Sequence, residues 1–240
     1  MTAPRLLPGA SEILLVADHA SNAIPPGIDL GIDPALLDTH IAVDIGTEAL
    51  AEALAGRLGA TAIINSVSRL VIDCNRDAAA ADVIPVASDG HVITGNLSLN
   101  AAEKSFRIDA IYRPYHSAIA RQIADARPRL IISLHSFTPQ LATRPDEARP
   151  WPVSILHNRD DRGAVLALDR LAAAGYLVGD NLPYSGRNLN HTMNIHAELN
   201  EIPYICLEIR QDGLAYAAGI EQWAETVARL VPAVAAGLGG

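Results

Sequence analysis

The sequence predicts an α/β protein whose mostly parallel sheet is covered by helices on both faces. Short, mostly apolar runs such as residues 130–134 alternate along the chain with longer segments of helical periodicity. Strands that are apolar on both faces are typical of parallel sheets buried between two layers of helices. A chain of 240 residues that is 50% hydrophobic can form one large core, so one domain over residues 1–240 is expected.

Periodicity predicts each element in turn. Strands are expected at residues 12–16, 61–64, 70–72, 130–134, 153–156 and 204–209. Helices are expected at residues 47–58, 103–126, 162–174 and 216–236. Leu50, Leu54 and Leu58 share one face of the first helix, Pro114 should kink the second, and Gly175 should end the third.

Three stretches are rich in turn residues and are expected to be loops: residues 77–100, 136–152 and 180–192. Loops of this length in a compact domain are usually functional or mobile. They are therefore candidates for the walls of a binding site.

Charge and composition restrict the possible partners. The net charge is −9 and the pI about 5.3, which argues against nucleic acid because phosphate binding needs a cationic surface. No apolar run reaches the roughly 18 residues of a membrane span, and residues 1–10 lack the pattern of a signal peptide. A cytoplasmic protein is expected. Cys74 and Cys206, which both lie in apolar runs, are then expected to be buried free thiols.

Polar side chains gather where the predicted strands end. In open α/β sheets, ligands bind beyond the carboxyl ends of the strands. The residues that end or follow four predicted strands are Asp18 and His19; Asp73, Asn75 and Arg76; His135 and Ser136; and Glu208 and Arg210. The sequence therefore predicts a functional site at this edge of the sheet.

His19 and His135 are the natural candidates for a metal pair. A lone histidine is more often structural, but two at strand ends beside carboxylates favour a metal. A catalytic zinc has three protein ligands and one open position. The third ligand is either Asp44 or Asn22; Asp44 offers the anionic oxygen that zinc prefers. Asp18 could instead orient His19.

Glu208 is the candidate general base, because hydrolysis needs a carboxylate that takes a proton from water and passes it to the leaving nitrogen. The alternative is an ion pair between Glu208 and Arg210, which share one face of the predicted strand.

Three arginines are candidate anchors for an anionic substrate: Arg69, Arg76 and Arg187. Arginine grips a carboxylate through two parallel hydrogen bonds. Arg76, which lies next to Asn75 at a predicted strand end, is favoured. Either Arg69 or Arg187 could stabilise an oxyanion.

Several strings follow one another in a recognisable order. They are Asp18-His-Ala-Ser-Asn22 with Ile24-Pro25, Ser68-Arg-Leu-Val-Ile-Asp-Cys-Asn-Arg76, Leu134-His-Ser-Phe-Thr-Pro139, Asn181-Leu-Pro-Tyr-Ser185 and Leu207-Glu-Ile-Arg-Gln-Asp212. Together they resemble the N-formylglutamate amidohydrolase family, and they cover most of the chain. The same order is similar to the wider zinc carboxypeptidase and aspartoacylase group.

The resemblance implies roles for individual residues. His19 and His135 would bind one zinc ion, Asn75 and Arg76 the substrate carboxylate, and Glu208 would be the base. Ser136, in the His-Ser-aromatic string, is a further candidate for substrate binding. Asn22 stands where the wider group has glutamate, so the choice between Asn22 and Asp44 stays open.

The resemblance also implies a fold and an activity. The fold would be a single three-layer α/β/α domain with a mixed sheet, of the phosphorylase/hydrolase-like type. The activity would be zinc-dependent hydrolysis of a small N-acyl amino acid, such as N-formyl-L-glutamate, in amino-acid degradation. Two alternatives remain: a carboxypeptidase or peptidoglycan amidase with a longer substrate, and a non-catalytic relative that binds ligand without zinc. A serine hydrolase is disfavoured, since no Gly-x-Ser-x-Gly string is present.

Overall fold

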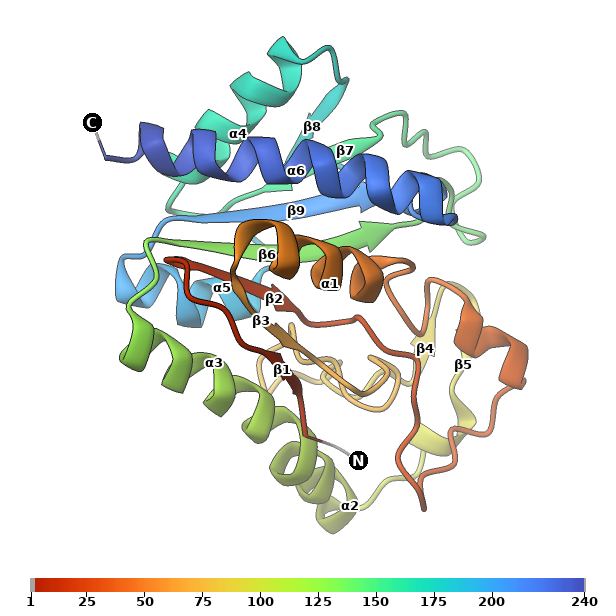
Figure 1. The fold of residues 1–240 in the computed structure, drawn as a ribbon. Helices are drawn as coiled ribbons and strands as arrows, with labels where there is room; N and C mark the ends of the chain where they lie inside the picture. Colours follow the sequence, from red (N-terminus) through yellow and green to blue (C-terminus); the bar gives the residue numbers. More distant parts are fainter. Residues whose placement is uncertain (1–2, 240) are drawn as a thin grey trace.

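A seven-stranded sheet forms the middle layer of the computed structural model, which describes residues 3–239 (Figure 1). In spatial order its strands are β1 (Arg5–Leu7), β3 (Thr61–Ile64), β2 (Ile13–Ala17), β6 (Leu130–Phe137), β9 (Tyr204–Arg210), β7 (Val153–Leu156) and β8 (Val178–Asp180). The central strands β3, β2, β6 and β9 are parallel, whereas β1 and the β7–β8 pair run the opposite way. The predicted α/β class with a mostly parallel, mixed sheet is confirmed.

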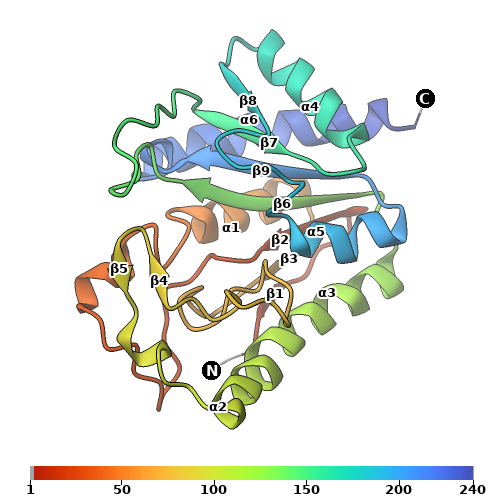
Figure 2. The same cartoon turned by 180° about the vertical axis from the view of Figure 1, so that it is seen from behind.

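Helices cover both faces of this sheet (Figures 1 and 2). On one face lie α1 (Thr47–Leu58), α4 (Arg162–Ala173) and α6 (Ala217–Gly237); on the other lie α2 (Ala101–Arg107), α3 (Arg113–Ala126) and α5 (His191–His196). The side chains of β2 show why both layers form. Leu15 and Ala17 belong to the core with α1 and α6, whereas Leu14 and Val16 belong to the core with α3.

The long helix predicted at residues 103–126 is present and is interrupted near Pro114. A π-helical segment, Ile108–Tyr112, joins α2 to α3. Proline has no N–H and its ring collides with the carbonyl four residues earlier, so the wider turn before Pro114 relieves that clash. Asn100 caps the start of the helix by accepting hydrogen bonds from Ala102 and Glu103.

The prediction of a strand at residues 70–72 is wrong. This segment is buried but irregular, and its carbonyl groups bond to side chains instead of a neighbouring strand. Asn96 donates to the Leu70 carbonyl at 2.8 Å, and Arg107 donates to the Val71 carbonyl at 2.8 Å. Because these buried polar side chains satisfy the backbone, the apolar run needs no place in the sheet.

The other predicted strands and helices are confirmed to within a few residues. The largest difference is β6, which continues through His135 and Ser136 to Phe137 and is buried along its whole length. His135 and Ser136 are polar, so a hydrophobicity pattern ends the predicted strand before them. The sequence prediction also missed the short elements β1, β8 and α5 and the hairpin of β4 (Ala87–Ser88) and β5 (His91–Val92).

Strand direction places one long loop beside the carboxyl ends of the parallel strands. β7 is antiparallel to β9, and Val153 at its start pairs with Ile209 near the end of β9. The chain from β6 to β7, the 138–152 loop, therefore begins and ends at the same edge of the sheet and crosses the end of β9.

Two further observations bear on the sequence-based expectations. Cys74 and Cys206 are buried and free, as predicted. Among residues 3–239, no helix combines the length and the apolar character that crossing a bilayer requires.

Candidate active site

A cavity of about 480 Å³ lies beyond the carboxyl ends of β2, β6 and β9. This volume is within the usual range for a small-molecule site. The predicted site residues that line it are His19, Asp44, Arg69, Asn75, Arg76, His135, Ser136 and Glu208. The structure therefore brings together polar groups from three strands and from the irregular segment after β3.

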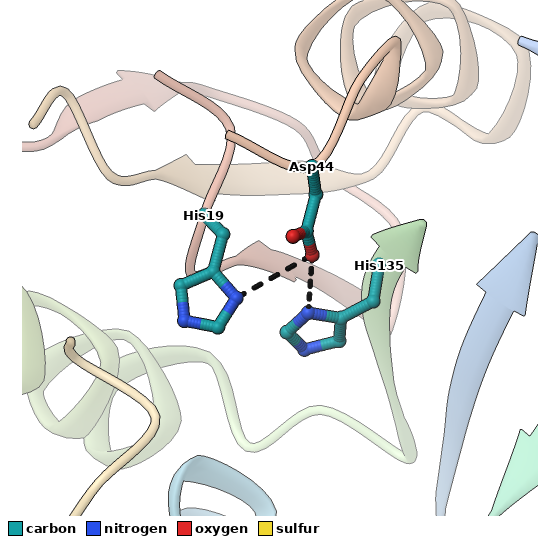
Figure 3. A group of neighbouring side chains, drawn as sticks. All are labelled: His19, Asp44 and His135. Atoms are coloured by element: carbon teal, nitrogen blue, oxygen red, sulfur yellow. Dashed lines mark hydrogen bonds and ion pairs between the residues drawn. The ribbon is translucent and has the colours of Figure 1, made fainter. Parts of the chain in front are cut away.

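Three buried side chains from different parts of the chain meet in this cavity (Figure 3). The Oδ2 atom of Asp44 lies 2.8 Å from Nδ1 of His135 and 3.4 Å from Nδ1 of His19. One ligand atom from each of the three residues falls within 4.8 Å of the others. Two imidazole nitrogens and one carboxylate oxygen form a donor set that suits zinc.

The second nitrogen of each imidazole contacts another carboxylate. Nε2 of His19 lies 2.7 Å from Oδ1 of Asp73, and Nε2 of His135 lies 3.2 Å from Oδ2 of Asp18. Such outer carboxylates fix the ring orientation and place the proton on Nε2, which leaves Nδ1 free to bind a metal. Asp18 therefore contacts His135 rather than His19, contrary to the expectation from sequence.

The hydrogen bonding of His19 is also compatible with a bound metal ion. Nδ1 of His19 is buried and accepts no hydrogen bond from the described part of the chain. A buried polar atom without a partner is costly in a folded protein. A cation bound between His19, Asp44 and His135 would remove that cost.

Mutual contacts set the charge state of this group. Burial acts to raise the pKa of Asp18, but the contact with His135 outweighs it and lowers the pKa to about 2. Burial likewise opposes ionisation of Asp44 and Asp73, yet His19 and Arg69 hold the pKa of both below the ordinary range. The carboxylates are therefore ionised at neutral pH.

Arg69 connects the two carboxylates that surround His19. Its Nη1 donates to Asp44 and its Nη2 to Asp73, each at 3.0 Å. The bond to Oδ1 of Asp44 leaves Oδ2 directed at the two histidines. The side chain of Arg69 is 28% exposed and also lines the cavity.

Local backbone structure holds Asp44 in place. Its N–H donates to the carbonyl of His19 at 2.9 Å. Two residues later Gly46 has φ +81°, and a Cβ there would lie 2.5 Å from Cβ of Leu214. Only glycine fits this close, left-handed turn between Asp44 and α1.

Glu208 lies on β9 directly beside His135 in the parallel register. It is buried, and among the described residues its Oε2 has no hydrogen-bond partner. Burial raises its pKa to about 7, with a smaller increase from Asp44 that His135 opposes. A carboxyl with a pKa near neutrality is suited to take and release a proton.

The alternative in which Glu208 pairs with Arg210 is wrong. Nε and Nη2 of Arg210 donate to Asp212, at 2.9 and 3.0 Å, and Nη1 donates to the carbonyl of Arg149. Arg210 therefore holds the 138–152 loop, and Glu208 faces the cavity.

The substrate-binding candidates occupy different places. Asn75 accepts a hydrogen bond from the Thr192 N–H at 2.9 Å, which ties it to the start of α5. Arg76 lines the cavity, is 30% exposed, and contacts Asp82 through Nε at 3.4 Å. The hydroxyl of Ser136 donates to the Ile45 carbonyl, so this residue supports the Asp44 turn.

Two candidates lie apart from the cavity lining. Asn22 donates to Asp38 at 2.9 Å, and Arg187 is exposed. Neither belongs to the residues that line the cavity. Their positions follow from loop paths that the sequence pattern does not reveal.

Sequence reasoning also missed several residues of the cavity wall. They are His40, Asp89, Thr143, Arg144, Arg149 and Tyr184. Arg149 is buried, donates to the hydroxyl of Tyr184 at 2.9 Å, and lies over its ring. These residues belong to loops without periodicity, and only Tyr184 carried a signal, because it lies in the string Asn181–Ser185 that supports the family resemblance.

Comparisons with known proteins agree with this arrangement of fold and site. The family model for N-formylglutamate amidohydrolase matches residues 11–215. A gene product of Agrobacterium tumefaciens has a crystal structure with a TM-score of 0.94 and 31% identity, over 100% of this chain and 97% of that chain. An N-formylglutamate amidohydrolase from Ralstonia eutropha has a TM-score of 0.69 and 22% identity, over 98% and 97%. No curated protein sequence matches the chain.

The chain is a three-layer α/β protein with a cavity lined by ionisable side chains at the strand ends, and the family model that it matches is that of a hydrolase acting on amides. The chain belongs to the N-formylglutamate amidohydrolase family.

Proposed function

We propose that this chain is a zinc-dependent amidohydrolase that cleaves the amide bond of a small N-acyl amino acid, such as N-formyl-L-glutamate. One observation carries the proposal: the His19–Asp44–His135 group opens into the same cavity as Glu208, whose Oε2 has no hydrogen-bond partner among residues 3–239. The family to which the chain belongs supports the same chemistry.

His19, Asp44 and His135 would hold the zinc ion, with Asp73 and Asp18 as their outer carboxylates. Asp44 is preferred to Asn22 as the third ligand because it lies between the two histidines. When bound, zinc supplies a Lewis acid that polarises the scissile carbonyl and lowers the pKa of water.

Glu208 is the proposed general base. It lies beside His135, and its free Oε2 can accept a proton from the attacking water and then deliver it to the leaving nitrogen. Burial keeps the carboxyl near the pKa that this two-way transfer needs.

Arg76 is the proposed anchor for the substrate carboxylate, with Asn75 held beside it by α5. Of the two arginines considered for the oxyanion, Arg69 lines the cavity next to Asp44, and Arg187 does not. Arg69 is therefore the proposed oxyanion donor, in addition to its contacts with the two carboxylates.

Metal content and substrate scope together test this function. We expect about one zinc per chain in the purified protein, and much less in His135→Ala. The protein should release free amino acid from at least one member of a panel of N-formyl and N-acetyl amino acids. Equal zinc in both samples would remove His135 from the site.

The same assay separates the alternatives. A protein that binds these compounds without turnover would be the non-catalytic relative, and turnover restricted to peptides or peptidoglycan fragments would support a longer substrate. A small metabolite as substrate is consistent with the proposed cytoplasmic location.

A further inference from the structure

The tip of the β4–β5 hairpin carries one aspartate in an unusual backbone conformation. Asp89 and Gly90 have φ values of 40° and 85°. Both are positive, as in the two-residue turns that favour Asp-Gly in hairpins. The turn directs the Asp89 side chain away from solvent, because this carboxylate is only 4% exposed.

The Asp89 carboxylate is bonded entirely to other parts of the chain. Oδ1 accepts from the N–H and the hydroxyl of Thr143, at 2.9 and 2.7 Å. Oδ2 accepts from the N–H of Ala142 at 2.9 Å and contacts Nε2 of His40 at 3.0 Å. We call these four residues the Asp89 latch. It joins the hairpin to the 138–152 loop.

The two segments that the latch joins form walls of the cavity. Ser88 and Asp89 line it from the hairpin, and Leu141, Thr143 and Arg144 line it from the 138–152 loop. Both segments lie on the side of the molecule where β6 and β9 end (Figures 1 and 2). Separation of hairpin and loop would therefore widen the cavity without any change in the sheet.

The latch is a principal tie for both segments. A two-stranded hairpin is only marginally stable by itself, and β4 and β5 have two residues each. Near its far end the 138–152 loop is held separately, because Arg149 bonds to Tyr184 and to the carbonyl of Thr138, and Arg210 donates to the Arg149 carbonyl. Loss of the Asp89 carboxylate would therefore free residues 141–144 and leave both ends of the loop attached.

We propose that Asp89 is a specificity-determining residue that limits substrate length. The closed latch holds two walls of the cavity together, and an open latch would admit substrates extended at either end. This inference rests on the proposed amidohydrolase function, because it concerns which amides reach Glu208.

The test compares substrates of different length on Asp89→Ala. The probes are N-formyl-L-glutamate, N-formyl-L-glutamyl-L-alanine and N-octanoyl-L-glutamate. We expect kcat/KM for at least one longer probe to rise about tenfold relative to N-formyl-L-glutamate, which corresponds to about 1.4 kcal/mol. Asp146→Ala removes an exposed carboxylate from the same loop and should leave the ratio unchanged.

Hydrogen exchange checks the latch independently of turnover. The amides of Ala142 and Thr143 should exchange faster in Asp89→Ala, and Asp146→Ala should match the wild type. Thr143→Val is the second variant, in case Asp89→Ala fails to fold. It removes the hydrogen bond from the Thr143 hydroxyl and keeps the side-chain shape, so the kcat/KM ratio and the exchange rates should shift in the same direction.

Each outcome decides a separate point. Unchanged exchange would show that Asp89 does not hold the loop, and faster exchange with an unchanged ratio would overturn its role in specificity. If the wild type cleaves neither these probes nor any member of the N-formyl and N-acetyl amino acid panel, the proposed function fails. The latch is then judged by calorimetric binding of the same probes, where an unchanged length preference in the variant overturns it.

Discussion

At the scale of single residues, Glu208 has an Oε2 atom without a hydrogen-bond partner in the described part of the chain, so a substitution there should change activity and leave stability intact. Glu208→Gln keeps the shape and removes the proton acceptor. We expect kcat to fall by about 10²–10⁴-fold, with a smaller change in KM, because the proton moves on the way to the transition state. Steady-state kinetics and thermal melting on the same preparation measure both effects.

The melting temperature of Glu208→Gln should not decrease. The substitution breaks no ion pair, since Arg210 bonds to Asp212, and it removes a carboxyl whose pKa is raised to about 7 by burial. Glu201→Gln, on the exposed turn before β9, is the matched control. A destabilised but fully active Glu208→Gln would contradict the assignment of the base.

A second prediction concerns Arg76 as the anchor of the substrate carboxylate. Arg76→Lys keeps the charge but loses the planar, two-bond grip on a carboxylate. We expect kcat/KM to decrease by about 10–100-fold, the value of one or two charge-assisted hydrogen bonds. Arg187→Lys is the control, because Arg187 is exposed and outside the cavity lining. Equal effects of the two substitutions would show that Arg76 is not the anchor.

Part of the site was predictable from sequence for a physical reason. His19, His135 and Glu208 directly follow or interrupt apolar runs, where a polar residue is conspicuous. The pairing of His19 with Asp73 was not, because it depends on the irregular path of residues 65–76. Arg149 was missed because other charged residues surround it in a loop.

At the scale of elements, strands and helices could be predicted wherever an apolar pattern coincided with regular backbone hydrogen bonding. The failure at residues 70–72 shows the limit of this signal. Hydrophobicity reports burial, and a buried segment can satisfy its backbone through side chains such as Asn96 and Arg107. The partners that decide between strand and loop are distant in sequence.

Asn96 provides the prediction at this scale. Its amide donates to the carbonyls of Leu70 and Pro85, and its Oδ1 accepts from Arg107 at 2.8 Å. Asn96→Ala removes the donor to the carbonyls of Leu70 and Pro85, at about 1–3 kcal/mol each, whereas Arg107 keeps its bond to the Val71 carbonyl. We expect the free energy of unfolding to fall by roughly 2–5 kcal/mol, measured by urea denaturation.

Asn188→Ala, in an exposed part of the loop before α5, is the control for this substitution and should change stability by less than about 0.5 kcal/mol. A similar small effect of Asn96→Ala would show that water or local rearrangement replaces the bonds.

At the scale of the whole molecule, a histidine pair makes the packing of α3 against α5 sensitive to acid. Nε2 of His116 donates to the Cys74 carbonyl, so its Nδ1 accepts from Nε2 of His196 at 2.8 Å. Burial lowers the pKa of both histidines to about 4, and the neighbouring His191 adds to this, whereas Asp18 opposes it. Both rings are neutral in the folded protein at pH 7.

The pKa values of His116 and His196 determine whether acid raises or lowers the stability of the fold. The unfolded histidines titrate near pH 6.5 and the folded ones near 4, so stability is fully present above pH 6.5 and decreases as pH falls towards 4. His196→Gln should therefore lose less stability than the wild type between pH 7 and pH 5, by about 1–2 kcal/mol.

Both proteins are melted in the presence of the same chelator, so that any contribution from metal binding at the proposed ligands His19 and His135 is the same in both. Parallel curves of stability against pH for the two proteins would show that His196 does not titrate with folding.

The direction of β7 has a consequence for how this protein can diversify. Both ends of the 138–152 loop lie at one edge of the sheet, so residues can be inserted or deleted there without displacing a strand or helix. The cost of closing a longer surface loop rises only slowly with its length. A change in the length of this loop would therefore reshape one wall of the proposed substrate cavity and leave His19, Asp44, His135 and Glu208 in place.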